Sequence, residues 1–299
     1  MIIIQMSGGL GNQMFQYALY LKLKKLGHDV KFDDRTEYDR PEVRPIQLSA
    51  FGIRYPAATH DEVIDITDGS MKLRDRIRRR LTGRKTAEYA ENGTCYDPLV
   101  MNRDPAYLVG NFQSERYFAD IEGEVRKAFQ FDPEIISDEI KEWEKRITAD
   151  DAAAIHIRRG DYLNAKDVYG DICTDEYYDA AIDVILKKHP DTVFYLFSND
   201  HEWSDMFMGR HKDIPMHSVK CSTEYTGYLD MYLMSKCKGH IIANSSFSWW
   251  GAWLCSDSQK EVIAPKVWLN NGKCADIHTD DMILIDKGGI IFDKESEDV

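Results

Sequence analysis

The residues of this chain best suited to bind an anion begin at Arg158. The segment 152–162 (AAAIHIRRGDY) is an apolar run that ends in Arg158, Arg159, Gly160 and Asp161. A short apolar run closed by a glycine is consistent with a buried strand, and in an open parallel sheet ligands sit outside the carboxyl ends of the strands. A guanidinium group matches phosphate oxygens in a bidentate way that lysine cannot. This pattern predicts an anion site; the alternative is a surface Arg–Asp ion pair at a strand end.

Two more apolar runs in the second half of the chain end in polar clusters. The run 193–197 is followed by Ser198, Asn199 and Asp200, and the run 239–243 is followed by Asn244, Ser245 and Ser246. In a doubly wound sheet these ends line one crevice with Arg158. Ser245, Ser246 and the free N–H groups that open the next helix make a second anion site. Asp200 is negative, so we expect it to accept hydrogen bonds from a guanine base or from ribose hydroxyls.

A nucleoside diphosphate is the ligand class that needs an arginine, a helix N-terminus and a carboxylate together. The P-loop motif G-x-x-x-x-G-K-[ST] is absent from the chain, which argues against phosphoryl transfer. The glycines near the start of the chain do not match G-x-G-x-x-G, which argues against a dinucleotide-dependent oxidoreductase.

A second candidate site follows the first apolar run, residues 1–6. Gly8, Gly9 and Gly11 make a turn there, and Asn12 and Gln13 come directly after it. Glycines allow a backbone to approach a ligand closely, and the two amides can hydrogen-bond to it. On this interpretation Asn12 and Gln13 both bind a ligand; the resemblance described below implies that Asn12 belongs to the donor side, and we assign Gln13 to the acceptor side. The alternative is a tight turn in which Asn12 caps the helix.

The elements that must position these residues alternate between strand and helix. After the glycine turn we expect a helix of about four turns that ends at Gly27, and then a strand over 30–32. Residues 33–110 are less regular. The further elements expected are helices over 137–147, 174–189, 224–238 and 247–255, with Ser137 and Thr174 as N-caps, and strands over 152–157, 193–197, 239–243 and, as the last one, 261–264. This alternation predicts an α/β protein with doubly wound parallel sheets.

Composition limits the class of protein. The 299 residues are enough for two domains, and we place the boundary near residue 150, which gives domains 1–150 and 151–299. A net charge of −13 argues against broad nucleic-acid binding. The six cysteines show no C-x-x-C spacing, so we expect free thiols and neither a zinc site nor a redox pair. Without a signal segment or an apolar run of transmembrane length, a cytoplasmic protein is the expectation.

Five segments together resemble a known family. They are GGLGNQMFQYA, GNFQSERYF, HIRRGDY, FSND and DMYLMSKCKGHIIANSSFSWWGAWL, and they span positions 8 to 254. The chain is identified on these segments as similar to the α-1,2-fucosyltransferases of glycosyltransferase family eleven. The resemblance implies a GT-B-like fold: two Rossmann-type parallel-sheet domains facing a central cleft, with the N-terminal one on the acceptor side.

The resemblance also implies an activity. GDP-β-L-fucose is then the donor, bound mainly by the C-terminal domain, and fucose moves with inversion to the 2-hydroxyl of a terminal galactose in a glycan. No metal and no other cofactor are required. Carried over by motif, Arg158 contacts the diphosphate and His156 lies near the guanine. Asp200, Ser246 and Asn12 complete the donor site.

The roles of three residues stay open at this point. The acceptor hydroxyl must lose a proton, and Asp161 is our candidate base; the competing interpretation is that it only orients Arg158 or Arg159 through an ion pair. Arg159 faces the sheet or a structural carboxylate instead of a ligand. His156, inside a strand, is either a guanine contact or a core histidine. Within enzymes, the runner-up is a transferase with the same donor but another linkage or acceptor. From another class, the alternative is a non-catalytic nucleotide-sugar-binding module.

Two conspicuous segments lie apart from these motifs. The basic run 72–85 (KLRDRIRRRLTGRK) is interpreted as a solvated helix face, and weak contact with anionic lipid headgroups or an acidic acceptor is the alternative. Trp249, Trp250 and Trp253 could stack on a sugar, but their helical spacing favours the core. We expect a bacterial, cytoplasmic enzyme, or one peripheral to the inner membrane.

Overall fold

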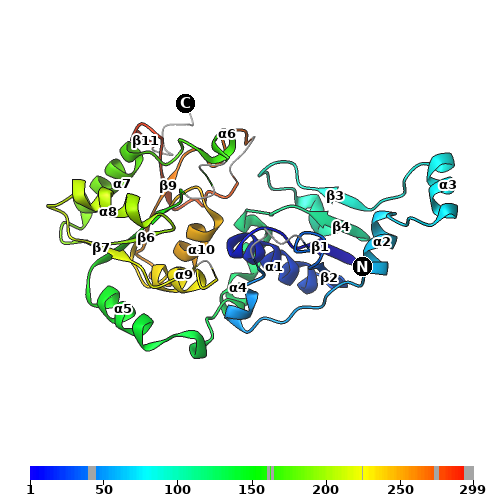
Figure 1. Ribbon diagram of the computed structural model, residues 1–299, viewed down its shortest axis with the longest axis horizontal. Coiled ribbons are helices and arrows are strands. Elements are labelled where there is room, and N and C mark those ends of the chain that lie inside the picture. Colours follow the sequence, from blue (N-terminus) through cyan, green and yellow to red (C-terminus); the bar gives the residue numbers. More distant parts are fainter. Residues whose placement is uncertain (40–44, 160–161, 163–164, 224, 273–275, 293–299) are drawn as a thin grey trace. The chain divides into compact units, whose positions relative to one another are not determined.

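The computed structural model describes residues 1–39, 45–159, 162, 165–223, 225–272 and 276–292 (Figure 1). The chain divides into two compact units, Met1–Gln130 and Phe131–Val299, here called the N-terminal and C-terminal units. The sequence places the boundary near residue 150. The structure assigns the intervening helix α5 (Asp138–Ala149) to the C-terminal unit, because its Ile140 and Ile147 pack in the core of that unit.

The N-terminal unit is built on a four-stranded sheet of order β2-β1-β4-β3, in which all strands are parallel. The strands are β1 (Ile2–Gln5), β2 (Val30–Asp33), β3 (Glu88–Ala90) and β4 (Ala106–Val109). The helices are α1 (Leu10–Lys25), α2 (His60–Thr67), α3 (Leu73–Thr82) and α4 (Glu122–Ala128), with short 3₁₀ turns at Leu48–Phe51, Pro98–Asn102, Glu115–Tyr117 and Ala119–Ile121. The apolar strand β1 lies inside the sheet, and its residues Ile2, Ile3 and Ile4 are fully buried.

Helix α1 confirms the predicted strand–turn–helix unit. Gly27 follows the helix with a φ of +89°, and the N–H of His28 bonds to the carbonyl of Leu23, as in a glycine-terminated helix. At the other end the N-cap is Gly9, and Asn12 lies inside the helix. The alternative in which Asn12 caps the helix is therefore wrong.

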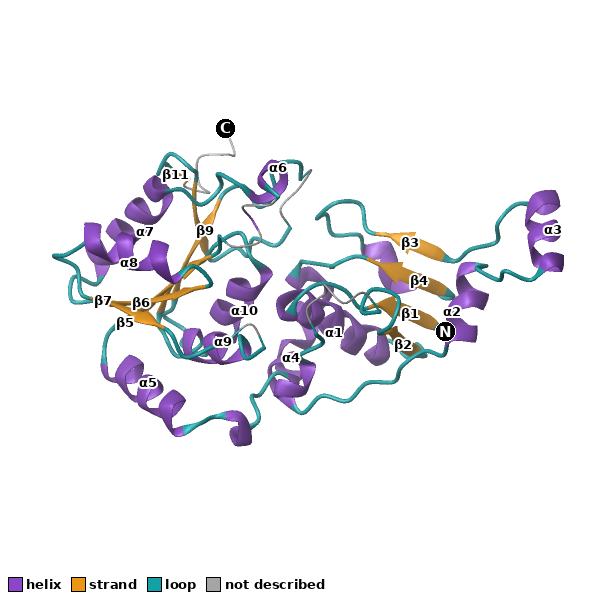
Figure 2. Ribbon diagram, viewed as in Figure 1, coloured by secondary structure: helices purple, strands orange, loops and turns teal. Residues whose placement is uncertain are grey.

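The C-terminal unit is built on a seven-stranded sheet of order β11-β10-β9-β8-β5-β6-β7 (Figure 2). The strands are β5 (Ala152–Ile157), β6 (Val193–Ser198), β7 (Met216–Val219), β8 (Gly239–Ile241), β9 (Glu261–Pro265), β10 (Met282–Ile285) and β11 (Ile291–Phe292). The helices besides α5 are α6 (Lys166–Tyr169), α7 (Asp175–Lys188), α8 (His201–Arg210), α9 (Tyr228–Met234) and α10 (Ser246–Leu254), and a 3₁₀ turn spans Pro133–Ile135. Only the pairing of β10 with β11 is antiparallel among the described pairs.

The strand order of the C-terminal unit reverses beside β5. From β5 the chain adds β6 and β7 on one side and then β8, β9 and β10 on the other. This is the doubly wound order in which ligands bind outside the carboxyl ends of the strands on either side of the reversal. The switch point lies between β5 and β8, and two of the three predicted polar clusters follow these two strands.

The core of the C-terminal unit has two layers because β5 is buried on both faces. Ile155 and Ile157 face a cluster that contains α7 and α8, whereas Ala152 and Ala154 face one that contains α5 and α9. The helices on both sides of this sheet are visible in Figure 2. The tryptophans of α10 belong to the core, as predicted, since Trp249 and Trp250 are fully buried and Trp253 nearly so.

Four expectations need correction. The irregular stretch 33–110 also contains α2, α3, β3 and β4. Helix α9 is shorter than the predicted 224–238, because the Thr226 hydroxyl accepts a hydrogen bond from the N–H of Thr223 in a turn that precedes it. β9 is not the last strand, since β10 and β11 follow. Cys95 is disulfide-bonded, contrary to the expectation of free thiols, whereas Cys173, Cys221, Cys237 and Cys255 are free.

Candidate active site

Arg158 and Arg159 follow directly after β5, at the carboxyl end of the central strand. Both side chains are partly exposed. The Arg158 guanidinium carbon lies 5.6 Å from the ring centre of Tyr162. The Tyr162 hydroxyl in turn donates a hydrogen bond to the carbonyl of Asn244 at 2.9 Å. Tyr162 thus ties the segment after β5 to the segment after β8, and it brings Arg158 to the switch point.

The neighbouring Arg159 is oriented toward the end of β6. Its backbone N–H donates to Asn199 Oδ1 at 3.3 Å, and its Nε lies 3.4 Å from Asp200 Oδ2. The guanidinium carbon also lies 5.1 Å from the ring centre of Trp203. Arg159 therefore meets a protein carboxylate, as one of the sequence-based interpretations proposed. Trp203 and Tyr162 were not predicted as site residues, because their contacts with the two arginines form only in the folded chain.

Asp200 has structural partners on both oxygens. Oδ1 accepts a hydrogen bond from the N–H of Trp203 at 3.0 Å and so caps α8, and Oδ2 faces Arg159. A ligand hydroxyl or N–H that bonds to Asp200 shares an oxygen with one of these groups. The ion pair also makes the Asp200 region less negative than the sequence suggests.

The segment after β8 prepares the N-terminus of α10. Asn244 is buried and serves the fold, since its Nδ2 donates to the carbonyl of Trp268 at 3.2 Å. Ser245 is the N-cap of α10, and its side chain makes no capping hydrogen bond. Ser246, the first helical residue, is partly exposed. The first-turn N–H groups of a helix attract anions, so the second anion site predicted beside Arg158 stays a prediction that this helix end is suited to.

His156 is buried within β5, with 4% of its surface exposed. Its ring lies 5.5 Å from the ring of Phe247, in the first turn of α10, and its carbonyl accepts a hydrogen bond from the Tyr178 hydroxyl at 3.0 Å. The side chain thus sits under the start of α10 and next to the expected anion site. This position suits a residue that supports the site from the core.

In the N-terminal unit, the turn after β1 brings two amides together. Gln113 Nε2 donates to Asn12 Oδ1 at 2.8 Å, although the two residues are far apart in sequence. Gly8 has a φ of +71°, and a Cβ at this position would lie 2.4 Å from Asn12 Nδ2. Glycine is therefore required for the turn and for the position of Asn12. Gln113 lies in the GNFQSERYF segment, but its role as a partner of Asn12 depends on tertiary contact.

Gln13 does not have the environment expected of an acceptor ligand. It is fully buried, and its Nε2 lies within hydrogen-bond distance of the carbonyls of Gly8 and Pro45 and of the Tyr38 hydroxyl. Its Oε1 accepts from the N–H of Gln47 at 2.9 Å. The side chain fastens the glycine turn to a distant loop, and this geometry gives Gln13 a structural role in place of the predicted acceptor contact.

Two partly buried carboxyl groups have strongly raised pKa values. Burial raises the pKa of Glu91 to about 7, although its Oε2 accepts hydrogen bonds from the N–H groups of Asn111 and Phe112. Burial likewise raises the pKa of Asp230 to about 7, and Ser222 donates to its Oδ2 at 2.5 Å. Neither residue was predicted from the sequence, because an isolated Glu or Asp carries no sign of its burial. The predicted base Asp161 lies outside the described residues.

The comparisons with known proteins bear on the same segments. The profile described as glycosyl transferase family 11 matches residues 87–283. This range covers about two thirds of the chain and contains β5, β6 and β8 with the polar segments that follow them. The chain belongs to glycosyltransferase family 11. The family resemblance found in the sequence is thereby confirmed, and Asn12 and Gln13 lie outside the matched range.

Relatives of this family 11 glycosyltransferase include bacterial and animal proteins. It is 30% identical over 288 residues to an alpha-1,2-colitosyltransferase of Escherichia coli, which covers 90% of this chain and 92% of the relative. It is 25% identical over 256 residues to galactoside alpha-(1,2)-fucosyltransferase 1 of Saimiri boliviensis boliviensis, over 83% of this chain and 63% of the relative. Among solved structures, the NodZ alpha-1,6-fucosyltransferase soaked with GDP-fucose aligns over 85% of this chain and 92% of its own, with 14% identity and a TM-score of 0.46.

The two-unit α/β architecture of this family 11 glycosyltransferase agrees with the predicted GT-B-like fold class. Within the described residues, no group of three or more His, Cys, Asp or Glu side chains is arranged to hold a metal ion. In the same part of the chain, no helix is both long enough and apolar enough to cross a lipid bilayer.

Proposed function

We propose that this glycosyltransferase moves L-fucose from GDP-β-L-fucose to the 2-hydroxyl of a terminal galactose, with inversion at the sugar. The observation that carries the proposal is the switch point of the C-terminal sheet, where Arg158 follows β5 and Ser245 and Ser246 open α10 after β8. The colitosyltransferase and the animal fucosyltransferase, the two relatives found by sequence, both carry an α-1,2 linkage in their names, which supports the 2-hydroxyl as the position of transfer.

The proposed chemistry is a single displacement in which the bond from fucose to the diphosphate breaks as the bond to the acceptor oxygen forms. Negative charge develops on the leaving diphosphate, so donors preorganised around it lower the barrier. Arg158 supplies a bidentate cation and the N–H groups opening α10 supply a helix terminus. We propose that these groups serve the diphosphate without a metal ion or another cofactor.

The acceptor hydroxyl must transfer its proton as the new bond forms. Asp161 stays our candidate for this base, because a carboxylate two residues after Arg159 follows the strand end that holds the donor. The alternative role of Asp161 was to orient Arg158 or Arg159 through an ion pair. For Arg159, Asp200 already forms such a pair. We propose that the acceptor is bound by the N-terminal unit and that Asn12, held by Gln113 at the end of β1, keeps its proposed role on the donor side.

The decisive experiment mixes the purified protein with GDP-β-L-fucose and a lactose-type acceptor, measures GDP release, and determines the linkage of the product. An α-1,2-fucosylated product is expected, with and without EDTA. GDP binding without turnover would favour the non-catalytic sugar-nucleotide-binding module. A product with another linkage would retain the donor and overturn the regiochemistry.

A second donor must be tested in the same assay, because one relative is named a colitosyltransferase. Turnover with GDP-colitose and none with GDP-fucose would show that the donor sugar is colitose and would leave the proposed diphosphate site unchanged. A comparison of kcat/KM for the two donors decides between them.

Arg158→Ala tests the diphosphate assignment. Loss of a preorganised donor to a developing oxyanion costs on the order of a hundredfold to a thousandfold in kcat, and Arg158→Lys is expected to recover only part of it because lysine lacks the fork. Arg126→Ala, which removes an arginine paired with Glu122 on α4, is the matched control and should keep full activity. Near-normal turnover of Arg158→Ala would overturn the assignment.

Asp161→Asn tests the base. A base role predicts a large fall in kcat and loss of the acidic limb of the pH–rate profile. Asp167→Asn, in α6, is the control with the same change on a nearby element. Little change in kcat for Asp161→Asn would exclude the base role and leave only the orienting one.

A further inference from the structure

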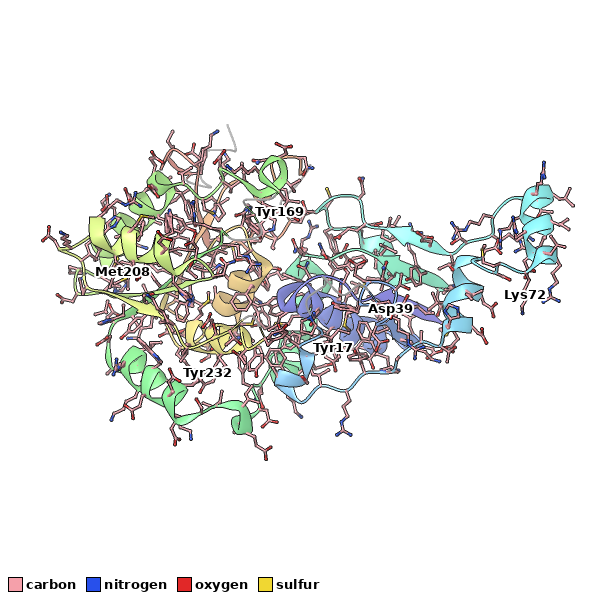
Figure 3. The ribbon with its side chains drawn as sticks, in the orientation of Figure 1. Tyr17, Asp39, Lys72, Tyr169, Met208 and Tyr232 are labelled. Atoms are coloured by element: carbon pink, nitrogen blue, oxygen red, sulfur yellow. The ribbon has the colours of Figure 1, made fainter. Side chains whose placement is uncertain are left out.

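Helix α3 of the N-terminal unit is exposed to solvent except on the side that contacts residues 68–70. It has no buried residue. Figure 1 shows α3 set apart from the sheet of its own unit, beyond α2, and Figure 3 shows Lys72 at this isolated end. Three apolar side chains on it are largely exposed: Leu73 at 71%, Ile77 at 51% and Leu81 at 78%. Met71, just before the helix, is 77% exposed. Apolar side chains gathered in this way mark an interaction surface.

One side of α3 is fastened to the chain that precedes it. Arg78 pairs with the carboxylate of Asp68. Arg79 donates to the carbonyl of Asp68 at 2.9 Å and to that of Ser70 at 2.6 Å. Asp75 accepts a hydrogen bond from the Ser70 hydroxyl at 2.5 Å. These contacts define an inner face, made of Asp75, Arg78 and Arg79, and they fix the rotation of the helix about its axis.

The apolar side chains lie on the opposite side of the helix. At about 100° per residue, Leu73, Ile77 and Leu81 fall within an arc of about 80°, centred about 150° from the inner face. We call these three residues the apolar stripe. The contacts that hold the inner face therefore point the apolar stripe away from the body of the unit.

Arginines border the apolar stripe on both sides. On the same helical geometry Arg74 lies next to Leu81, and Arg80 and Arg76 lie next to Leu73. All three are exposed. The run 72–85 holds eight basic residues and one acidic residue, a net +7 in a chain of net −13, which leaves −20 on the other residues. A cationic surface is thus concentrated on one helix of an otherwise acidic protein.

We infer that α3 binds the surface of an anionic lipid bilayer. An interfacial helix places an apolar stripe in the acyl boundary while basic residues beside it meet anionic headgroups. The geometry of α3 matches both requirements on the same outward side. An acidic protein or a nucleic acid would be attracted by the arginines alone and gives no reason for Leu73, Ile77 and Leu81 to be exposed between them.

The test is co-sedimentation of the full chain with vesicles of phosphatidylcholine alone and of phosphatidylcholine mixed with phosphatidylglycerol. The protein is expected to bind the mixed vesicles and to bind them less as salt rises. Leu73→Ser, Ile77→Ser and Leu81→Ser combined should weaken binding about tenfold or more at every salt concentration. Arg74→Gln, Arg76→Gln and Arg80→Gln combined should weaken it on the order of a hundredfold and remove the preference for phosphatidylglycerol.

A control variant separates this surface from net charge. Lys24→Gln, Lys127→Gln and Lys187→Gln combined remove the same charge from exposed positions on other helices and should leave vesicle binding unchanged. Far-ultraviolet circular dichroism verifies the fold of every variant. The binding assay needs no sugar nucleotide, so its result is independent of the proposed reaction.

Three outcomes would overturn the inference. One is equal binding to both vesicle types, and another is unchanged binding by the variant without the apolar stripe. The third is binding of an acidic polypeptide or RNA through the arginines with no binding to vesicles.

Discussion

Glu91 offers a quantitative test of how the N-terminal unit buries charge. The residue follows β3, and its Oε2 accepts hydrogen bonds from the N–H groups of Asn111 at 2.8 Å and Phe112 at 3.1 Å. Burial nevertheless raises its pKa from 4.5 to about 7. Glu91→Gln keeps an oxygen for both N–H groups and removes the titration. The variant therefore isolates the cost of ionising this partly buried carboxyl group.

The magnitude follows from linkage between protonation and folding. Between pH 4.5 and about 7 the unfolded chain releases the Glu91 proton and the folded protein keeps it. The stability of the wild-type protein consequently falls as pH rises through this interval. At about 1.4 kcal/mol for each tenfold change in proton affinity, the total loss is about 3 kcal/mol. The stability difference between Glu91→Gln and wild type should grow by this amount from pH 4.5 to pH 7 and then stay constant.

Urea unfolding at a series of pH values measures this difference. All six tryptophans lie in the C-terminal unit, so fluorescence follows that unit, whereas circular dichroism follows both. The change is expected in the transition of the N-terminal unit. Glu88→Gln, an exposed position on β3, is the matched control and should leave the pH dependence unchanged. Parallel stability curves for Glu91→Gln and wild type from pH 4.5 to 8 would refute the reasoning.

Three further predictions follow from single contacts. Burial raises the pKa of Asp230 to about 7, so the wild-type protein loses stability as pH rises toward 7. The stability of Asp230→Asn relative to wild type should therefore be greater at pH 8 than at pH 5 in tryptophan-detected unfolding of the C-terminal unit, and an equal difference at both pH values would contradict this. Gly239→Ala should destabilise the protein by about 1–3 kcal/mol in urea, since its Cβ would lie 2.8 Å from that of Ala153; an unchanged midpoint would contradict this. Tyr162→Phe should weaken GDP binding about fivefold in calorimetry by removing the hydrogen bond to Asn244; equal affinity would show that this link does not shape the site.

The strand ends of the C-terminal unit could be read from the sequence because their signals are local. Apolar runs closed by polar residues predicted β5, β6 and β8 to within a few residues, and Thr174 and Ser137 cap α7 and α5 as expected. Helix caps and the spacing of apolar residues are determined by residues that are close together in the sequence. The order of the strands, in which β5 and β8 are neighbours, followed from the doubly wound topology as a rule.

Other features were decided only when distant segments met. Gln13 looked like a ligand contact until Tyr38, Pro45 and Gln47 enclosed its amide. The carboxylate of Asp200 is shared with Arg159, which no spacing in the sequence reveals.

Together, these residues separate what the sequence by itself determined from what required the folded chain. The sequence determined the family, the alternation of strands and helices, and the polar residues at the strand ends, because these are encoded in short segments. Tertiary structure decided which polar atoms were already satisfied, which carboxyls were buried, and which side of α3 was left uncovered. Burial and hydrogen-bond partners come from residues far away in the chain, and the free energy of a polar group depends on both.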